Sequence, residues 1–150
     1  MKTAKGVLFW ILSCTWGAIM TLIGFIAAVF LTLTGHKPKR FHYNIYFEVG
    51  EGWGGVELGA FFVVQKNSSL HTKQHEAGHS LQNIMFGPLM PFLVCIPSAV
   101  RYWHRRLAVK RHKITYAELP PYDAVWFEGT ATKLGERYFP DTDSQIRAAD

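Results

Sequence analysis

The stretch 7–34 contains no charged residue, and this feature limits the fold of the 150-residue chain more than any other. Its apolar part, Val7–Leu33, would extend about 40 Å as one helix, which exceeds the roughly 30 Å hydrocarbon core of a bilayer. A cleaved signal peptide is the alternative, but the apolar run is too long for one. We therefore expect residues 1–40 to form a transmembrane anchor followed by a basic linker, 36–40.

A second uncharged segment, 84–100, is interrupted by Pro88, Pro91 and Pro97. Fully helical, it would extend only about 26 Å, and the prolines oppose a continuous helix. We expect a membrane-associated re-entrant or interfacial segment, or a broken helix packed on the first apolar helix. Cations and aromatics of 101–113 follow directly and suit the lipid headgroup layer, although an ordinary solvated helix face has the same composition.

Alternating and β-branched residues predict strands at Phe41–Phe47 and Val56–Val64, separated by a glycine-rich turn. The second strand precedes a helix expected at 69–86, which Gly87-Pro88 ends. It could form the edge on which an extended substrate lies, or it could be part of a plain core hairpin.

A last helix is expected from about Ala124 to Tyr138, capped by Asp123. A polar tail, 141–150, follows it. The chain is thus expected to be α+β and mainly helical. An N-terminal transmembrane helix would precede one small domain, 41–140, with a short β-hairpin or sheet before its central helix.

The central helix carries the sequence His75-Glu76-Ala77-Gly78-His79. Histidines four apart project from one helix face, where two imidazoles can hold one Zn²⁺ and leave positions for a third ligand and a water. Glu76 lies beside the pair and can act as a general base. Gly78 costs the helix about 1 kcal/mol relative to Ala, which indicates the close approach of another backbone or a ligand. An amphipathic helix with two partly exposed histidines is the alternative.

Glu128 is the best candidate for the third protein ligand. It is a carboxylate among apolar neighbours, and a metal or an ion pair would compensate for its burial. A surface glutamate paired with Lys73 or Lys133 is the alternative reading. The other candidates after the helix are Glu118, Asp123, Glu136, His104 and His112. His71, one turn upstream, could be a spare ligand, but a surface histidine near the helix start is the favoured interpretation.

The sequence His75-Glu76-x-Gly78-His79, followed on a later helix by Glu128-x-x-Ala131, resembles the gluzincin metallopeptidases. The resemblance is to their membrane-embedded branch, which includes the CAAX prenyl endopeptidases and the heat-shock membrane proteases. It implies that His75, His79 and Glu128 are zinc ligands and that Glu76 is the general base.

Thr132 stands where members of that branch have an Asp that helps to orient a ligand histidine. The Thr hydroxyl can accept a hydrogen bond but carries no charge, so its support would be weaker. Asn83 or Asp123 could substitute for it.

These features predict a membrane-anchored zinc metallopeptidase, with Zn²⁺ as cofactor and a peptide or protein near the lipid bilayer as substrate. A non-catalytic membrane zinc scaffold or adaptor is the alternative. A di-iron centre is excluded because the chain has no second Glu-x-x-His. The residues that could stabilise the oxyanion are Tyr116, Tyr122, Tyr138, His104 and His112.

Nucleic acid is not an expected partner, since no RNA-binding signature is present, and the sequence leaves the oligomeric state open. We expect an integral protein of the inner or plasma membrane. Lys37, Lys39 and Arg40 favour a cytoplasmic catalytic side by the positive-inside rule, whereas Lys2 and Lys5 oppose it.

Overall fold

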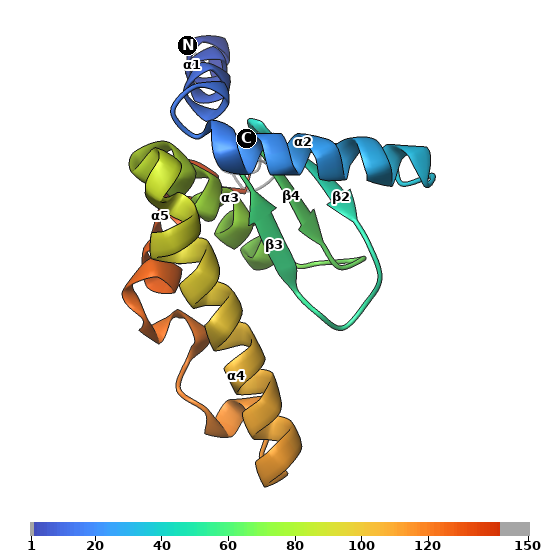
Figure 1. Cartoon of the computed structure of the whole chain (residues 1–150), viewed down its shortest axis with the longest axis vertical. Helices are drawn as coiled ribbons and strands as arrows, with labels where there is room; N and C mark the ends of the chain where they lie inside the picture. The colour runs from blue at the N-terminus through green and yellow to red at the C-terminus, as the bar shows by residue number, and fades with distance from the viewer. Residues whose placement is uncertain (1, 142–150) are drawn as a thin grey trace, which may run out of the picture.

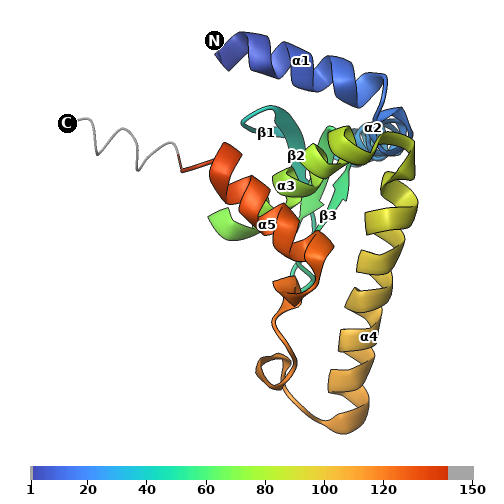
Figure 2. The ribbon, with the colours of Figure 1, turned by 90° about the vertical axis from the view of Figure 1, so that its left-hand side faces the viewer.

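The structure is a computed structural model that describes residues 2–141, so the expected tail lies outside the described residues except for residue 141. It is a mixed, mainly helical α+β arrangement, as the sequence predicts (Figures 1 and 2). The helices are α1 (Lys2–Cys14), α2 (Ala18–Leu33), α3 (Leu70–Phe86), α4 (Ile96–His112) and α5 (Trp126–Tyr138). The strands are β1 (Lys39–Phe41), β2 (Asn44–Glu48), β3 (Gly55–Leu58) and β4 (Phe61–Val64). Short helical turns are η1 (Gly87–Leu89), η2 (Pro91–Cys95), η3 (Tyr116–Glu118) and η4 (Tyr122–Ala124).

The strands form one mixed sheet in the order β1-β2-β4-β3. β2 and β4 run parallel, whereas each outer strand pairs antiparallel with its neighbour. The continuous strands expected at Phe41–Phe47 and Val56–Val64 are therefore wrong, because a turn divides each of them. His42 has a φ of 50° and Gly59 a φ of 74°, conformations that tight turns use and strands do not. β3 consequently forms one edge of the sheet.

The single long helix expected over Val7–Leu33 is also wrong, since α1 and α2 meet at an angle of 97°. At this elbow, Asn83 on α3 donates from Nδ2 to the Gly17 carbonyl oxygen at 3.1 Å. The same amide fills the space that a side chain at Gly17 would need. A long-range contact thus breaks the helix where local sequence would continue it. Among the described helices, none taken alone has the length and apolar character to cross a membrane.

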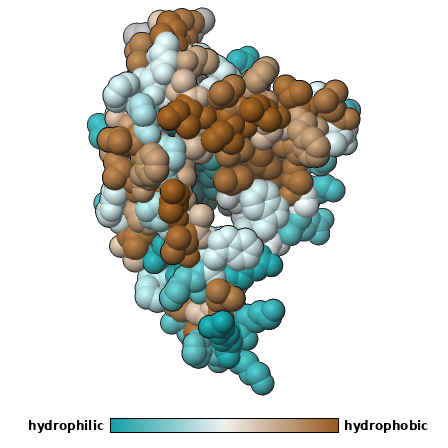
Figure 3. All heavy atoms as spheres, viewed as in Figure 1, coloured by the Kyte–Doolittle hydropathy of each residue, from teal (hydrophilic) through white to brown (hydrophobic). Residues whose placement is uncertain are grey.

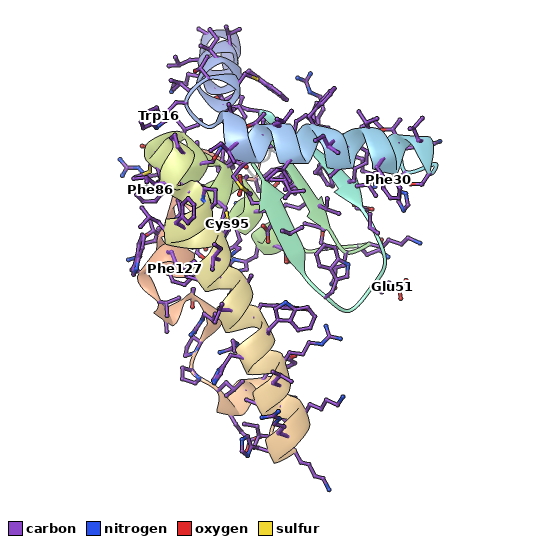
Figure 4. The ribbon with its side chains drawn as sticks, in the orientation of Figure 1. Trp16, Phe30, Glu51, Phe86, Cys95 and Phe127 are labelled. Carbon is purple, nitrogen blue, oxygen red and sulfur yellow. The ribbon has the colours of Figure 1, made fainter. Side chains whose placement is uncertain are left out.

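The chain between α3 and α4 is bent by 118°. One 3-10 turn and one π turn occupy 87–95, which confirms that the prolines prevent a continuous helix through 84–100. Gly87 has a φ of 53°, and a side chain there would overlap the indole of Trp16. The turn therefore packs against the elbow between α1 and α2, as Figure 4 shows for Trp16 and Phe86.

Helix α3 packs on the sheet, and α5 packs against α3 (Figure 2). The Ser69 side chain caps α3 by accepting a hydrogen bond from the Thr72 N–H at 3.1 Å. Helix α5 begins later than expected and without Asp123, because Asp123 lies in η4 and extended Val125 is the residue before the helix. Phe62 and Phe139, both fully buried, join the sheet to the end of α5.

The backbones of α3 and α5 touch at two glycines. A side chain at Gly78 would overlap the Ala131 carbonyl oxygen, and one at Gly135 would overlap the Gln74 carbonyl oxygen. The two helices can approach this closely only because both positions lack a Cβ. The close approach indicated by Gly78 in the sequence is therefore confirmed.

Replacing Gly78 with Ala should push α5 away from α3. We expect a loss of about 3 kcal/mol or more in the free energy of unfolding, measured by urea denaturation, since backbone atoms cannot yield as a flexible side chain can. Gly6→Ala is the matched control, because its added Cβ would meet only the edge of the Tyr43 ring at 3.2 Å. Equal stability of the two variants would contradict this account.

Candidate metal centre

Three side chains from two helices converge on one point: His75 and His79 from α3, and Glu128 from α5. Glu128 Oε2 lies 3.0 Å from His75 Nε2 and 3.1 Å from His79 Nε2, and the two Nε2 atoms are 3.1 Å apart. A tetrahedral ion with bonds of about 2.0–2.1 Å holds its ligand atoms roughly 3.3 Å apart. The triangle therefore matches the first three positions around such an ion, and this group could hold a metal.

Two of the three side chains, those of His79 and Glu128, are buried, and they form an ion pair. Glu128 has no exposed surface and His79 is 5% exposed. Burial raises the pKa of the Glu128 carboxyl, but hydrogen bonds with His75, His79 and Ser98 lower it more, so this pKa falls well below its usual range. Burial lowers the pKa of His79, whereas the bond to Glu128 and nearby carboxylates raise it to about 9. A metal ion must therefore displace a proton from His79, and binding should weaken at low pH.

Gln82 fixes the orientation of the His79 ring. Its Nε2 donates to the Phe127 carbonyl oxygen at 2.8 Å, which turns its Oε1 toward His79 Nδ1 at 2.7 Å. The amide oxygen can only accept a hydrogen bond, so Nδ1 must carry the proton. In the neutral ring, Nε2 is then free to bind a metal. Neither residue type nor spacing indicated Gln82 in the sequence.

Thr132 holds the other ligand histidine. Its Oγ1 lies 3.0 Å from His75 Nδ1, so the hydroxyl occupies the place where an orienting carboxylate was expected. Neither proposed substitute takes this role: Asn83 bonds to Gly17, and Asp123 is exposed.

Ser98 on α4 orients Glu128, donating from Oγ to Glu128 Oε1 at 2.5 Å. This bond occupies one carboxylate oxygen and leaves Oε2 facing the two imidazoles. Nothing in the local sequence indicates a role for Ser98, because α4 reaches the centre only through the bend before it.

Glu76 lies between α3 and the edge strand β3, and it is 6% exposed. A Cβ at Gly55 would lie 2.6 Å from Glu76 Oε1, so the missing side chain on β3 makes room for this carboxyl group. Burial raises the pKa of Glu76, while His75 and His79 oppose the shift. The carboxyl is thus placed beside the ligand histidines but does not belong to the triangle.

Tyr122 is the oxyanion candidate that the structure brings to the centre. Its ring lies 6.2 Å from that of His75, and its hydroxyl is 3.4 Å from Ser98 Oγ. Burial, followed by repulsion from Glu128, raises the pKa of Tyr122 to about 12, so the hydroxyl keeps its proton at neutral pH.

Two arginines of the basic stretch 101–113 hold the loop that carries Tyr122. Arg101 donates to the carbonyl oxygens of Tyr122 and Pro121 at 3.1 and 2.8 Å, and Arg105 donates to that of Pro120. Both guanidinium groups also lie over the Tyr122 ring, at 5.7 and 5.5 Å. These two cations are therefore engaged within the protein rather than presented to lipid headgroups.

The remaining candidates lie elsewhere. Glu118 caps η3 through Thr115, Glu136 pairs with His71 at 3.7 Å on the surface, and His104 and His112 are exposed on α4. Tyr138 is exposed on α5, and Tyr116 lines the cleft without contacting the triangle. The surface pairing considered for Glu128 is wrong, because Glu128 is buried and Lys73 pairs with Glu48 at 3.9 Å.

A cleft of about 1030 Å³ leads to the triangle. One wall is β3 with the chain before it, and the other is α4. Glu57 lies in the wall formed by β3 and is 6% exposed. Its Oε1 accepts a hydrogen bond from the Gly59 N–H, whereas its Oε2 has no partner among the described residues. Burial raises the pKa of Glu57 to about 8, although His79 opposes the shift.

Removing the Thr132 hydroxyl should weaken metal binding. Thr132→Val keeps the shape of the side chain, and we expect it to bind zinc about 10–100-fold more weakly, because His75 loses its acceptor. Thr132→Ser keeps the hydroxyl and should stay close to the parent. Competition with a chromophoric chelator measures both affinities, and equal binding by the Val variant would contradict this role.

The buried Glu57 carboxyl should make the metal-free protein less stable as the pH rises. Its folded-state pKa of about 8 lies above the ordinary 4.5, so the folded protein keeps a proton that the unfolded chain loses. The resulting stabilisation is complete below about pH 4.5 and is lost as the pH rises through about 8. We therefore expect Glu57→Gln to be more stable than the parent near pH 8, and this advantage to shrink toward about pH 5.

Urea unfolding in the presence of a chelator tests this expectation. Glu51→Gln, at an exposed loop position (Figure 4), is the control and should show no such pH-dependent difference. A stability advantage of Glu57→Gln that is independent of pH would contradict the assigned proton.

Comparisons with protein families, curated proteins and solved structures find no match to this chain. The resemblance to gluzincin metallopeptidases therefore depends on two motifs, His75-Glu76-x-Gly78-His79 and Glu128-x-x-Ala131. What the centre does must be inferred from its own geometry.

Proposed function

We propose that this chain is a zinc-dependent peptidase of the gluzincin type, held at a membrane. The observation that carries the proposal is the triangle formed by His75, His79 and Glu128, with mutual distances of 3.0–3.1 Å. Two histidines and one carboxylate are a ligand set typical of catalytic zinc, and they leave a fourth position for water or substrate. A purely structural zinc site more often has four protein ligands, including cysteines.

When bound, Zn²⁺ polarises a substrate carbonyl and lowers the pKa of a water toward about 7. Glu76 accepts the proton of the attacking water and transfers it to the nitrogen of the leaving amine. Its raised pKa favours this exchange, because a carboxyl that is too acidic would hold the proton poorly. The Tyr122 hydroxyl, which keeps its proton at neutral pH, donates to the oxyanion that develops on the substrate carbonyl.

The edge strand β3 supports an extended peptide as the substrate. Its inner edge pairs with β4 from Gly55 to Leu58, and its other side lines the cleft. A peptide lying along this edge can form main-chain hydrogen bonds, as in β-augmentation. Such binding brings a peptide carbonyl past Glu76, since Gly55 touches that carboxyl.

A non-catalytic zinc scaffold is the second candidate. It is favoured by the position of the triangle, which joins α3 to α5 where their backbones already touch. In that case the metal would act as a clip between the helices, and Glu76 would have no role in its binding.

Replacing Glu76 with Gln should separate the two functions. We expect peptide cleavage to fall by about 10²–10⁴-fold, because the general base is lost, while bound zinc and the unfolding curve stay unchanged. Cleavage is followed by mass spectrometry on a mixed peptide library, and zinc by metal analysis. Glu51→Gln is the matched control and should keep full activity.

Zinc binding by the parent with no cleavage of any peptide would leave the scaffold as the function. Loss of zinc on Glu76→Gln would contradict the assignment of Glu76 to the base rather than the ligand set.

A further inference from the structure

Helix α2 has no polar face. Its inward-facing residues include Gly24, which lies against Leu58 at the end of β3, and Ala28, which packs on the sheet. Met20 packs instead on Met90 and Val94 of the bend after α3. The outward side chains include Leu22, Phe25, Ile26, Val29, Phe30 and Leu33, with exposed fractions from 43% to 82%. A helix that is apolar all round belongs in an apolar environment. Figure 3 shows these side chains as one continuous brown area over α2.

The few hydroxyl groups at the ends of this area are already satisfied. Thr15 donates to the Ile11 carbonyl oxygen at 2.7 Å, Thr32 to that of Ala28 at 2.8 Å, and Thr34 to that of Phe30 at 3.0 Å. These side chains therefore need no water. A surface of this kind suits contact with lipid hydrocarbon better than contact with a protein surface that offers polar groups.

Both ends of the apolar stretch contact the same domain. Near the start of the apolar stretch, Trp10 donates from Nε1 to the Tyr43 carbonyl oxygen at 3.0 Å, and Gly6 lies against the Tyr43 ring. After α2 the chain enters β1 at Lys39, which pairs with Tyr46 in the same sheet. A segment that starts and ends on one small domain enters and leaves an apolar layer from one side.

Cations flank the elbow at both ends. Lys5 near the start of α1, and Lys37 and Arg40 after α2, are exposed, whereas Lys39 is paired with Glu48 at 2.8 Å. Charge at both ends complements an anionic lipid headgroup layer on one side of a membrane.

We propose that α1 and α2 form a monotopic anchor that enters a single leaflet of an anionic bilayer, with residues 5 and 37 on the same side. This inference deepens the membrane placement within the proposed function and is independent of hydrolysis. It also removes the conflict between Lys5 and Lys37 in the positive-inside rule, because both then face one compartment. A second copy of the chain is a less suitable occupant, since the same cations would face one another across the contact.

Vesicle binding by the full-length protein is the first test. We expect the parent to bind phosphatidylcholine vesicles that contain about a quarter phosphatidylglycerol more tightly than pure phosphatidylcholine vesicles. Phe30→Glu should weaken binding about tenfold or more, because a charge must enter the leaflet. Leu70→Glu, an equivalent change at the exposed start of α3, should not. Unchanged urea unfolding curves show that both variants are folded.

Equal vesicle binding by the parent and Phe30→Glu would overturn the proposal. A different result would also overturn it: the parent does not bind vesicles and is a dimer by light scattering, whereas Phe30→Glu is a monomer. A second copy of the chain would then cover α2.

Labelling from one side is the second test. In a variant with Cys14→Ser and Cys95→Ser, a single cysteine replaces Lys5 or Lys37, and a membrane-impermeant maleimide is added to the protein bound on sealed vesicles. Both positions should react fully before detergent is added. If one of the two reacts only after detergent, the segment crosses the bilayer and the single-leaflet anchor is wrong.

Discussion

The contact between the backbones of α3 and α5 is the constraint on which the candidate metal centre depends. Two glycines, Gly78 and Gly135, each face a carbonyl oxygen of the other helix, so the helices meet without side chains between them. Only at this separation can Glu128, with its short side chain, reach both imidazoles at about 3 Å. A wider spacing would leave a buried carboxylate without partners, which costs several kcal/mol. The fold and the chemistry of the centre therefore depend on the same two positions.

The centre is made rigid by neutral groups rather than by additional charge. Gln82 and Thr132 accept from the two ligand histidines, and Ser98 donates to Glu128. Two carboxyls, those of Glu57 and Glu76, already line the cleft, and that of Glu128 is buried beside the ligand histidines. A further buried carboxylate would raise the cost of charge in the metal-free state. A hydroxyl in the place of the expected Asp is consistent with this crowding.

The bent α1–α2 pair places the exposed apolar surface of α2 close to the cleft. α2 lies across the β3–β4 turn, where Gly24 touches the Leu58 carbonyl oxygen, so the apolar area and the edge strand share one end of the sheet (Figure 1). Asn83, one turn beyond His79 on α3, holds the elbow through Gly17. The same helix thus positions the two histidines of the candidate metal centre and fixes the shape of the apolar segment. An extended peptide close to a lipid surface would meet the cleft from this end.

The sequence by itself determined the helix with His75 and His79 on one face, its start near Ser69 and the close contact at Gly78, because these follow from helical periodicity and local backbone chemistry. It also singled out Glu128 as a buried carboxylate. Only the tertiary structure decided the elbow at Gly17, the division of both expected strands, and the roles of Gln82, Ser98 and Glu57. The elbow and the roles of Gln82 and Ser98 depend on partners far away in the chain, such as Asn83 for Gly17 or Phe127 for Gln82. Local pattern carries no information about such partners, because the distances that matter form only after the helices and the sheet have packed.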